Sequence, residues 1–173
     1  MNIPGIGDVT NCVDDEWYTS KELPIRVLGG IRCRIHVKEY DDDPQKEDFH
    51  VAIRNFLVAD ESVLRDAALP IYQYYLNCKD FFDPDGTLDI QSAGDVWKYV
   101  GLGKEPIFSR RQSGDKGIYV SLECGCEWEP EHGLEIVFKN GLKVNKVGPY
   151  DGCLTNSDAY GDDSLENVIF KSV

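Results

Sequence analysis

The clearest pattern in the N-terminal half is an alternation of apolar and polar residues over residues 31–38. Ile, Cys, Ile and Val occupy the odd positions, and Arg, Arg, His and Lys occupy the even ones. This alternation is typical of a strand with one buried and one solvated face. A short apolar run at 24–28 precedes it, and the intervening Gly29-Gly30 tolerates the positive φ of a turn. Residues 24–40 are therefore predicted to form a hairpin.

Two helical patterns follow this hairpin. Asp43 is expected to cap the first helix, with Pro44 at its first position, where a missing N–H costs little. A second helix is expected from Asp60 to about Asp80, with a kink or a break at Pro70. The first helix carries one apolar stripe, made of Phe49, Ala52, Ile53, Phe56 and Leu57. Both helices are thus expected to pack one side against a core.

Beyond the helices, Ser92 and Asp95 have the spacing of a capping box and predict a short helix. A short strand is expected within 104–111, and three alternating patterns follow near 118–126, 134–138 and 142–144. These patterns predict a C-terminal meander of strands.

The last two of these strands are joined by a turn at Asn140-Gly141. A two-residue loop would place the two apolar sets on opposite faces, which sacrifices too much burial. We therefore predict a three-residue loop at 139–141, with Gly141 in the left-handed region and a bulge. The predicted pairs are Phe138 with Leu142 and Ile136 with Val144.

Together these patterns predict an α+β fold, in which an antiparallel sheet packs against two or three helices. The sheet would combine the N-terminal hairpin with the C-terminal meander. A single domain is expected over 24–173, because 173 residues suffice to bury a sizeable core. Residues 1–23 are rich in Gly, Pro and Asp and show no period, so we expect a loosely ordered N-terminal arm.

Charge narrows the range of partners. The chain has 18 Lys and Arg residues against 31 Asp and Glu residues, which gives a net charge of −13. Such a field repels nucleic-acid phosphates and anionic membranes, and it favours a basic protein partner. The N-terminus has no secretion-signal pattern, and no apolar run approaches the roughly 20 residues of a membrane span. A cytoplasmic location is therefore expected, with the six cysteines reduced.

One set of residues could bind zinc, namely Cys124, Cys126 and His132. Two cysteines two positions apart on a strand point their sulfurs to one face, and the histidine follows six residues later. The same face also carries Val120 and Leu122, so core packing is the favoured interpretation and zinc the alternative. Cysteine–histidine catalysis lacks an orienting third group. No cofactor is expected.

The connection at 127–133 has two interpretations. In the structural one, Trp128 and Pro130 pin the loop, and His132 bonds to backbone. In the functional one, it is a recognition surface with an exposed tryptophan as its anchor. The candidate partner-binding residues are Glu127, Trp128, Glu129, Glu131 and His132 here, and Asp41, Asp42 and Asp43 in the acidic run before the first helix.

Several segments resemble a widespread bacterial family of small acidic domains of unknown function. The most specific elements are W-E-x-E-H-G at 128–133 and Y-D-G at 150–152, and the resemblance spans roughly 24–170. It implies a small cytosolic α+β protein without an established activity, and it brings no catalytic residues. Small acidic proteins of this type are similar in character to bacterial immunity proteins, by analogy only.

We therefore expect a non-catalytic binding protein, of the immunity or antitoxin type, that neutralises a basic toxin domain. The alternative is a metal-dependent or carboxylate-based enzyme centred on Cys124, Cys126, His132 and Glu129. A plain regulatory module is the third possibility.

Overall fold

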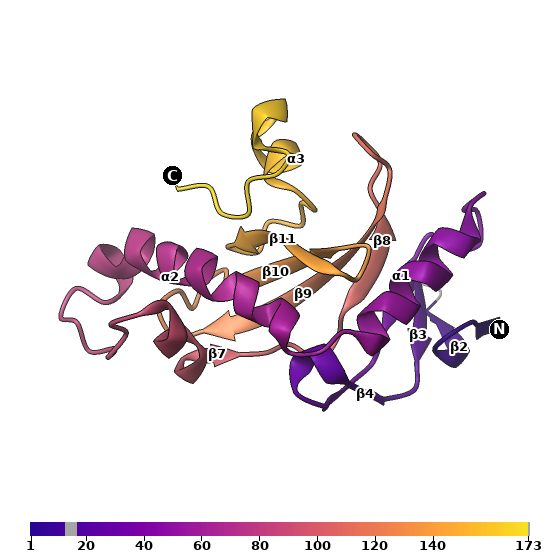
Figure 1. The fold of residues 1–173 in the computed structure, drawn as a ribbon, viewed down its shortest axis with the longest axis horizontal. Helices are drawn as coiled ribbons and strands as arrows, with labels where there is room; N and C mark the ends of the chain where they lie inside the picture. Colours follow the sequence, from indigo (N-terminus) through magenta and orange to yellow (C-terminus); the bar gives the residue numbers. More distant parts are fainter. Residues whose placement is uncertain (13–16, 173) are drawn as a thin grey trace.

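The computed structural model describes residues 1–12 and 17–172, in which the two long helices cover one face of a mostly antiparallel sheet (Figure 1). The helices are α1 (Lys46–Val58), α2 (Ser62–Phe82) and α3 (Asn156–Tyr160), and the 3₁₀ turns are η1 (Arg26–Leu28), η2 (Ala93–Lys98) and η3 (Asp163–Leu165). The strands are β1 (Asn2–Ile3), β2 (Gly7–Cys12), β3 (Trp17–Ser20), β4 (Leu23–Ile25), β5 (Ile31–Cys33), β6 (His36–Lys38), β7 (Val100–Gly101), β8 (Ile107–Arg110), β9 (Ile118–Cys126), β10 (Leu134–Lys139) and β11 (Lys143–Gly148). The α+β class is confirmed.

The main sheet has the order β1-β2-β3-β6-β8-β9-β10-β11 over the described residues, with β7 attached to β9. Every pairing in it is antiparallel except that of β6 with β8. The predicted N-terminal hairpin is present as β4 and β5, but it forms a separate two-stranded sheet. The predicted C-terminal meander is β8 to β11, and it forms the centre and one end of the main sheet.

The expected loose arm at 1–23 instead contributes β1, β2 and β3 to the main sheet. β1, β2 and β3 pair in succession, and β3 pairs with β6. Ile3, Ile6, Val9 and Tyr18 are buried. Strands this short give no visible period, but pairing with neighbours satisfies their backbone groups. Residues 13–16 of the expected arm lie outside the described residues.

The alternation over residues 31–38 correctly marks Cys33, Ile35 and Val37 as buried. The single predicted strand is nevertheless divided, because β5 pairs with β4 whereas β6 pairs with β3 and β8. His36, expected on the solvated side, is buried. It lies on a central strand, where Trp17 packs on its ring at 5.0 Å between centroids.

The stripe of α1 packs as predicted, with Phe49, Ala52, Ile53 and Phe56 buried against the sheet. The helix begins at Lys46, however, and the predicted cap at Asp43 is wrong. The Asp43 carboxylate instead accepts the Gln45 N–H at 2.7 Å, in a turn that precedes the helix.

α2 continues through Pro70 without a break. Proline removes one helical hydrogen bond, and the carbonyl left without it belongs to the exposed Asp66, where water can satisfy it.

The hairpin of β10 and β11 has a different register from the predicted one. Asn140 and Gly141 both have positive φ, 53° and 67°, and the loop spans Asn140 to Leu142. Phe138 is opposite Val144 and Ile136 is opposite Val147, with a bulge between these pairs. Because a bulge adds one residue to a strand, Val144 and Val147 can both face the core although they are three positions apart. Leu142, which was expected in the core, is 55% exposed.

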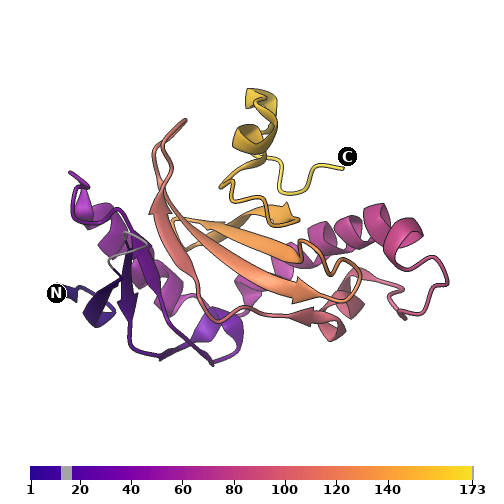
Figure 2. The ribbon, with the colours of Figure 1, turned by 180° about the vertical axis from the view of Figure 1, so that it is seen from behind.

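Residues 149–172, called the C-terminal strap here, begin on the face of the sheet away from α1 and α2 and wrap around β11 to α2. On the far face, Asp151 contacts the side chain of Lys146. The N–H of Val147 then donates to the Ile169 carbonyl at 2.8 Å. Finally, the Phe170 ring lies 6.1 Å from the Tyr74 ring on α2. Figure 2 shows the sheet from this far side, with α3 beyond β11.

Among the described residues, no helix is both long and apolar enough to cross a membrane.

Candidate functional site

The connection between β9 and β10, residues 127–133, is a rigid loop that is pinned from inside. Trp128 is fully buried, and its ring lies 6.3 Å from Tyr74 and 5.9 Å from Tyr75, both on α2. The expectation that an exposed Trp128 anchors a partner is therefore wrong. The structural interpretation holds for Trp128, whereas Pro130 is exposed and the His132 ring lies beside the Glu129 carboxylate rather than a backbone group. An indole buries a large apolar area, and the aromatic residues of α2 offer the place for it. Its Nε1–H has no hydrogen-bond partner among the described residues.

Glu129 is also buried, and its carboxylate organises the loop around it. Oε1 accepts the N–H of Glu131 at 3.0 Å, and Oε2 accepts the N–H of His132 at 2.8 Å. The Tyr74 hydroxyl donates to Oε2 at 3.3 Å. Burial, followed by nearby anionic groups that include Glu129, raises the pKa of Tyr74 strongly, so Tyr74 stays a hydrogen-bond donor. Glu129 therefore has no free surface to offer a protein partner.

Glu127, Glu131 and His132 are exposed, as a binding surface requires. The ligand atoms of Glu129, Glu131 and His132 converge, because they all lie within 4.8 Å of one another. His132 lines two neighbouring hollows, one of about 260 Å³ beside α2 and one of about 710 Å³ on the far face. This turn therefore places one buried carboxylate, one exposed carboxylate and one exposed imidazole close together.

The cysteines of the proposed zinc set do not join this group. The Cys124 thiol is buried, where it accepts the Gly103 N–H at 3.4 Å, and the Cys126 thiol donates to the Glu129 carbonyl at 3.5 Å. Burial raises the pKa of each thiol to about 12. Both sulfurs are thus protonated at neutral pH and behave as small apolar side chains. The core interpretation of Cys124 and Cys126 holds.

The acidic run 41–43 lies at the other end of the sheet. Asp43 is held by Arg110, which donates to its two carboxylate oxygens at 2.5 and 3.0 Å. The Arg110 hydrogen bond lowers the pKa of Asp43. Asp41 and Asp42 are exposed and border a hollow of about 550 Å³. Two of the three expected binding residues are therefore available, and the third has a structural role.

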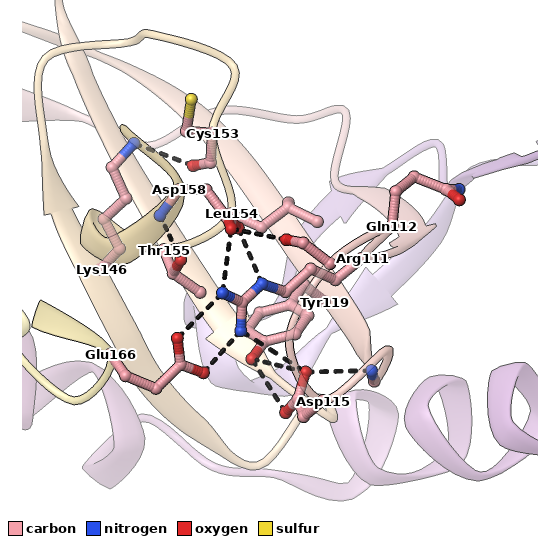
Figure 3. A network of polar contacts seen from close by, with 12 residues as sticks. Arg111, Gln112, Asp115, Tyr119, Lys146, Cys153, Leu154, Thr155, Asp158 and Glu166 are labelled. Atoms are coloured by element: carbon pink, nitrogen blue, oxygen red, sulfur yellow. Dashed lines mark hydrogen bonds and ion pairs between the residues drawn. The ribbon is translucent and has the colours of Figure 1, made fainter. Parts of the chain in front are cut away.

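Two buried cations beneath the C-terminal strap were not anticipated as important. Lys146 is 1% exposed and donates to the Glu135 carboxylate at 2.9 Å and to the Cys153 carbonyl at 2.9 Å. Arg111 is 3% exposed, and Figure 3 shows its guanidinium between the carboxylates of Asp158, Glu166 and Asp115. Lys146 lies between Asn145 and Val147 in the sequence, a context that does not mark it as buried.

The family of this chain is identified by comparison with known protein families. A family model described as "Domain of unknown function (DUF6985)" matches residues 6–154. The chain belongs to this family. The match confirms the expected membership, and it begins earlier than the resemblance did, so it includes β2 and β3. Most of the C-terminal strap, including α3, follows the region matched by the DUF6985 model. No curated protein and no solved structure matches the chain.

Proposed function

We propose that this DUF6985 protein is a non-catalytic binding protein whose acidic surface docks a basic protein, of the kind that immunity proteins and antitoxins neutralise. The surface meant is the acidic rim, defined as Glu39, Asp41, Asp42, Glu47 and Asp48. All five of these side chains are exposed at one end of the sheet. The net charge of −13 adds a long-range field that would speed the approach of a basic partner.

The observation that carries the proposal is that the protein itself holds this rim in place. Tyr18 donates its hydroxyl to Asp41, and Lys46 donates to the Asp41 carbonyl at 2.5 Å. Gln112 donates to the Glu39 carboxylate at 2.9 Å. A surface ordered before binding loses less conformational entropy when a partner arrives. The hollow beside the rim can admit a lysine or arginine side chain.

The test is co-expression of the tagged chain with the products of the neighbouring genes, followed by capture at low salt. We expect one basic protein to co-purify and to dissociate as the salt concentration rises, because exposed charges are screened. In a toxicity assay, the chain should also restore growth to cells that express this partner.

The decisive variant combines Glu39→Gln, Asp41→Asn and Asp42→Asn, and it should abolish capture. Its matched control combines Glu61→Gln, Asp66→Asn and Asp80→Asn, three exposed positions on or beside α2 that change the net charge by the same amount. An equal loss of partner capture in the two triple variants would show that only the overall charge matters, and it would refute a site specific to the acidic rim. The absence of any captured neighbour would refute the proposal as a whole.

A further inference from the structure

We propose a second site, independent of the acidic rim: Glu129, Glu131 and His132 bind a divalent transition-metal ion, with zinc as the ion to test. The ligand atoms of these three residues lie within 4.8 Å of one another. They come from a single turn of the chain, in the sequence Glu-Pro-Glu-His. Nothing in the acidic-rim proposal uses them.

The turn is held rigidly enough to keep the ligands together. Trp128 anchors its start beneath α2. At its end, the N–H of Gly133 donates to the Glu129 carbonyl at 3.1 Å. The Tyr74 hydroxyl shares its single hydrogen between the Gly133 carbonyl at 3.1 Å and Glu129 Oε2 at 3.3 Å. Gly133 has φ +64°, and a Cβ there would lie 2.7 Å from the Cys124 carbonyl oxygen. Only glycine fits this position, and the anchored ends hold the turn in place, a preorganisation from which a metal site benefits.

Glu129 has the features of a metal ligand supported by a second shell. Its side chain is 4% exposed, and donors from the loop and from Tyr74 fix the orientation of its carboxylate. Ligating carboxylates are commonly hydrogen-bonded in this way. Oε1 has a single hydrogen-bond donor among the described residues, and a carboxylate oxygen carries two lone pairs. One lone pair of Oε1 therefore remains for a cation.

The charges at the turn also favour a cation. The Glu131 carboxylate is exposed and could point into solvent, yet it lies within 4.8 Å of the Glu129 carboxylate. Two like charges at this separation repel each other by about 1–3 kcal/mol in a surface environment, and a divalent ion reverses the sign of that interaction. His132 Nδ1 lies 3.5 Å from Glu129 Oε2, so the imidazole stands beside the same oxygens.

The donor set indicates which ion is bound. One imidazole and two carboxylates suit Zn²⁺ and the neighbouring first-row ions, whereas Ca²⁺ and Mg²⁺ prefer oxygen ligands alone. Three protein ligands leave positions for water, as in sites that remain open to a further ligand. The two hollows beside His132 supply access to these positions.

The experiment titrates the full chain with Zn²⁺ under reducing conditions while the ring signals of its three histidines are followed by NMR. We expect one ring signal to shift and to saturate at one ion per chain. His132→Ala should remove that signal, and Glu131→Gln should weaken zinc binding about 10- to 100-fold, a range that changes near a metal site typically produce. Calcium and magnesium at the same concentration should leave the signal in place.

Two control variants separate this site from other zinc binding. Glu127→Gln makes the same charge change in the same loop, outside the converging group, and should bind zinc like the native chain. A Cys124→Ala and Cys126→Ala double variant should also keep the zinc-induced shift of the His132 signal. The proposal is overturned if no histidine signal shifts, or if the shift survives in Glu131→Gln at unchanged affinity. Both ligand variants are at exposed positions, so their folding should not limit the test.

Discussion

The two faces of the main sheet are covered by opposite chemistry. On one face, α1 and α2 pack apolar side chains, and the Phe56 ring meets those of Phe108 and Phe138 in T-shaped contacts at 5.6 and 5.3 Å. On the other face, the C-terminal strap packs over Lys146, Glu135 and Arg111, which form buried ion pairs. Apolar burial is non-directional, whereas a buried charge requires each of its partners. The helix face should therefore supply stability, and the strap face should make one arrangement of the chain unique.

The largest expected effect is on the helix face. Phe56→Ala should lower the free energy of unfolding by about 3–5 kcal/mol, because it removes a fully buried ring and leaves a cavity. Urea unfolding followed by circular dichroism measures this change. On the same helix, Val58 is 61% exposed, and Val58→Ala should change stability by less than about 0.5 kcal/mol. Similar values for the two variants would contradict the assignment of the core to this face.

The second-largest effect is expected on the strap face, where a charge-removing variant tests whether stability depends on matched charges. Lys146→Met should lower the free energy of unfolding by about 3 kcal/mol, because it leaves the buried Glu135 carboxylate without its cation. Adding Glu135→Gln should recover most of the loss, since the amide needs no counter-charge and can still accept from Ser121. A double-mutant cycle in urea measures the coupling. If the double variant is no better than the single one, charge matching is not what holds this face.

A smaller effect is expected where the strap meets Arg111. Its guanidinium bonds to two oxygens of Asp158 and two of Glu166, a forked geometry that lysine cannot reproduce. Arg111→Lys should cost about 1.5–3 kcal/mol, the scale of one hydrogen bond to a charged group, and should speed proteolysis within the strap. Arg65→Lys, at an exposed position on α2, is the matched control. Unchanged cleavage in Arg111→Lys would argue against this contact as the strap's anchor.

The smallest effect concerns pH. Burial alone raises the pKa of Asp158, but hydrogen bonds from Arg111 and Ser113 lower it below its ordinary value of 3.8. A carboxyl whose folded-state pKa is lowered contributes stability above its unfolded pKa and loses that contribution as pH falls through the folded value. Asp158→Asn should therefore cost about 1 kcal/mol near neutral pH and progressively less below about pH 4. Unfolding curves of the native chain and of Asp158→Asn across this pH range give the difference in their stability. A difference that grows as the pH falls would contradict the predicted direction of the effect.

The sequence predicted the helix face well and the strap face poorly, for a physical reason. The apolar stripe of α1 repeats at a local spacing, so the pattern alone reveals which side is buried. The ion pairs of Arg111 with Asp158 and Glu166 join residues 47 and 55 positions apart, and such pairs leave no local pattern. The register of the last hairpin was missed because it depends on a bulge, which places Val144 and Val147 on one face.

The candidate site was predicted in part. The sequence singled out the turn at 127–133 as a possible binding surface, and Glu131 and His132 are accessible there. Trp128 and Glu129 were assigned to the surface, yet α2 covers both of them. Their burial depends on Tyr74 and Tyr75, which are more than 50 residues away in the sequence. A tryptophan within a charged loop is compatible with either role, and only the tertiary contact decides between them.

The path of the strap around β11 has a consequence for self-association. β11 is the last strand in the sheet order, so its outer backbone groups could otherwise pair with a strand of another molecule. The strap occupies this position, because the Ile169 carbonyl accepts the N–H of Val147. Phe170 fastens the end of the strap against Tyr74. Beyond holding its own chain in place, the strap therefore covers part of the β11 edge and hinders edge-to-edge pairing there.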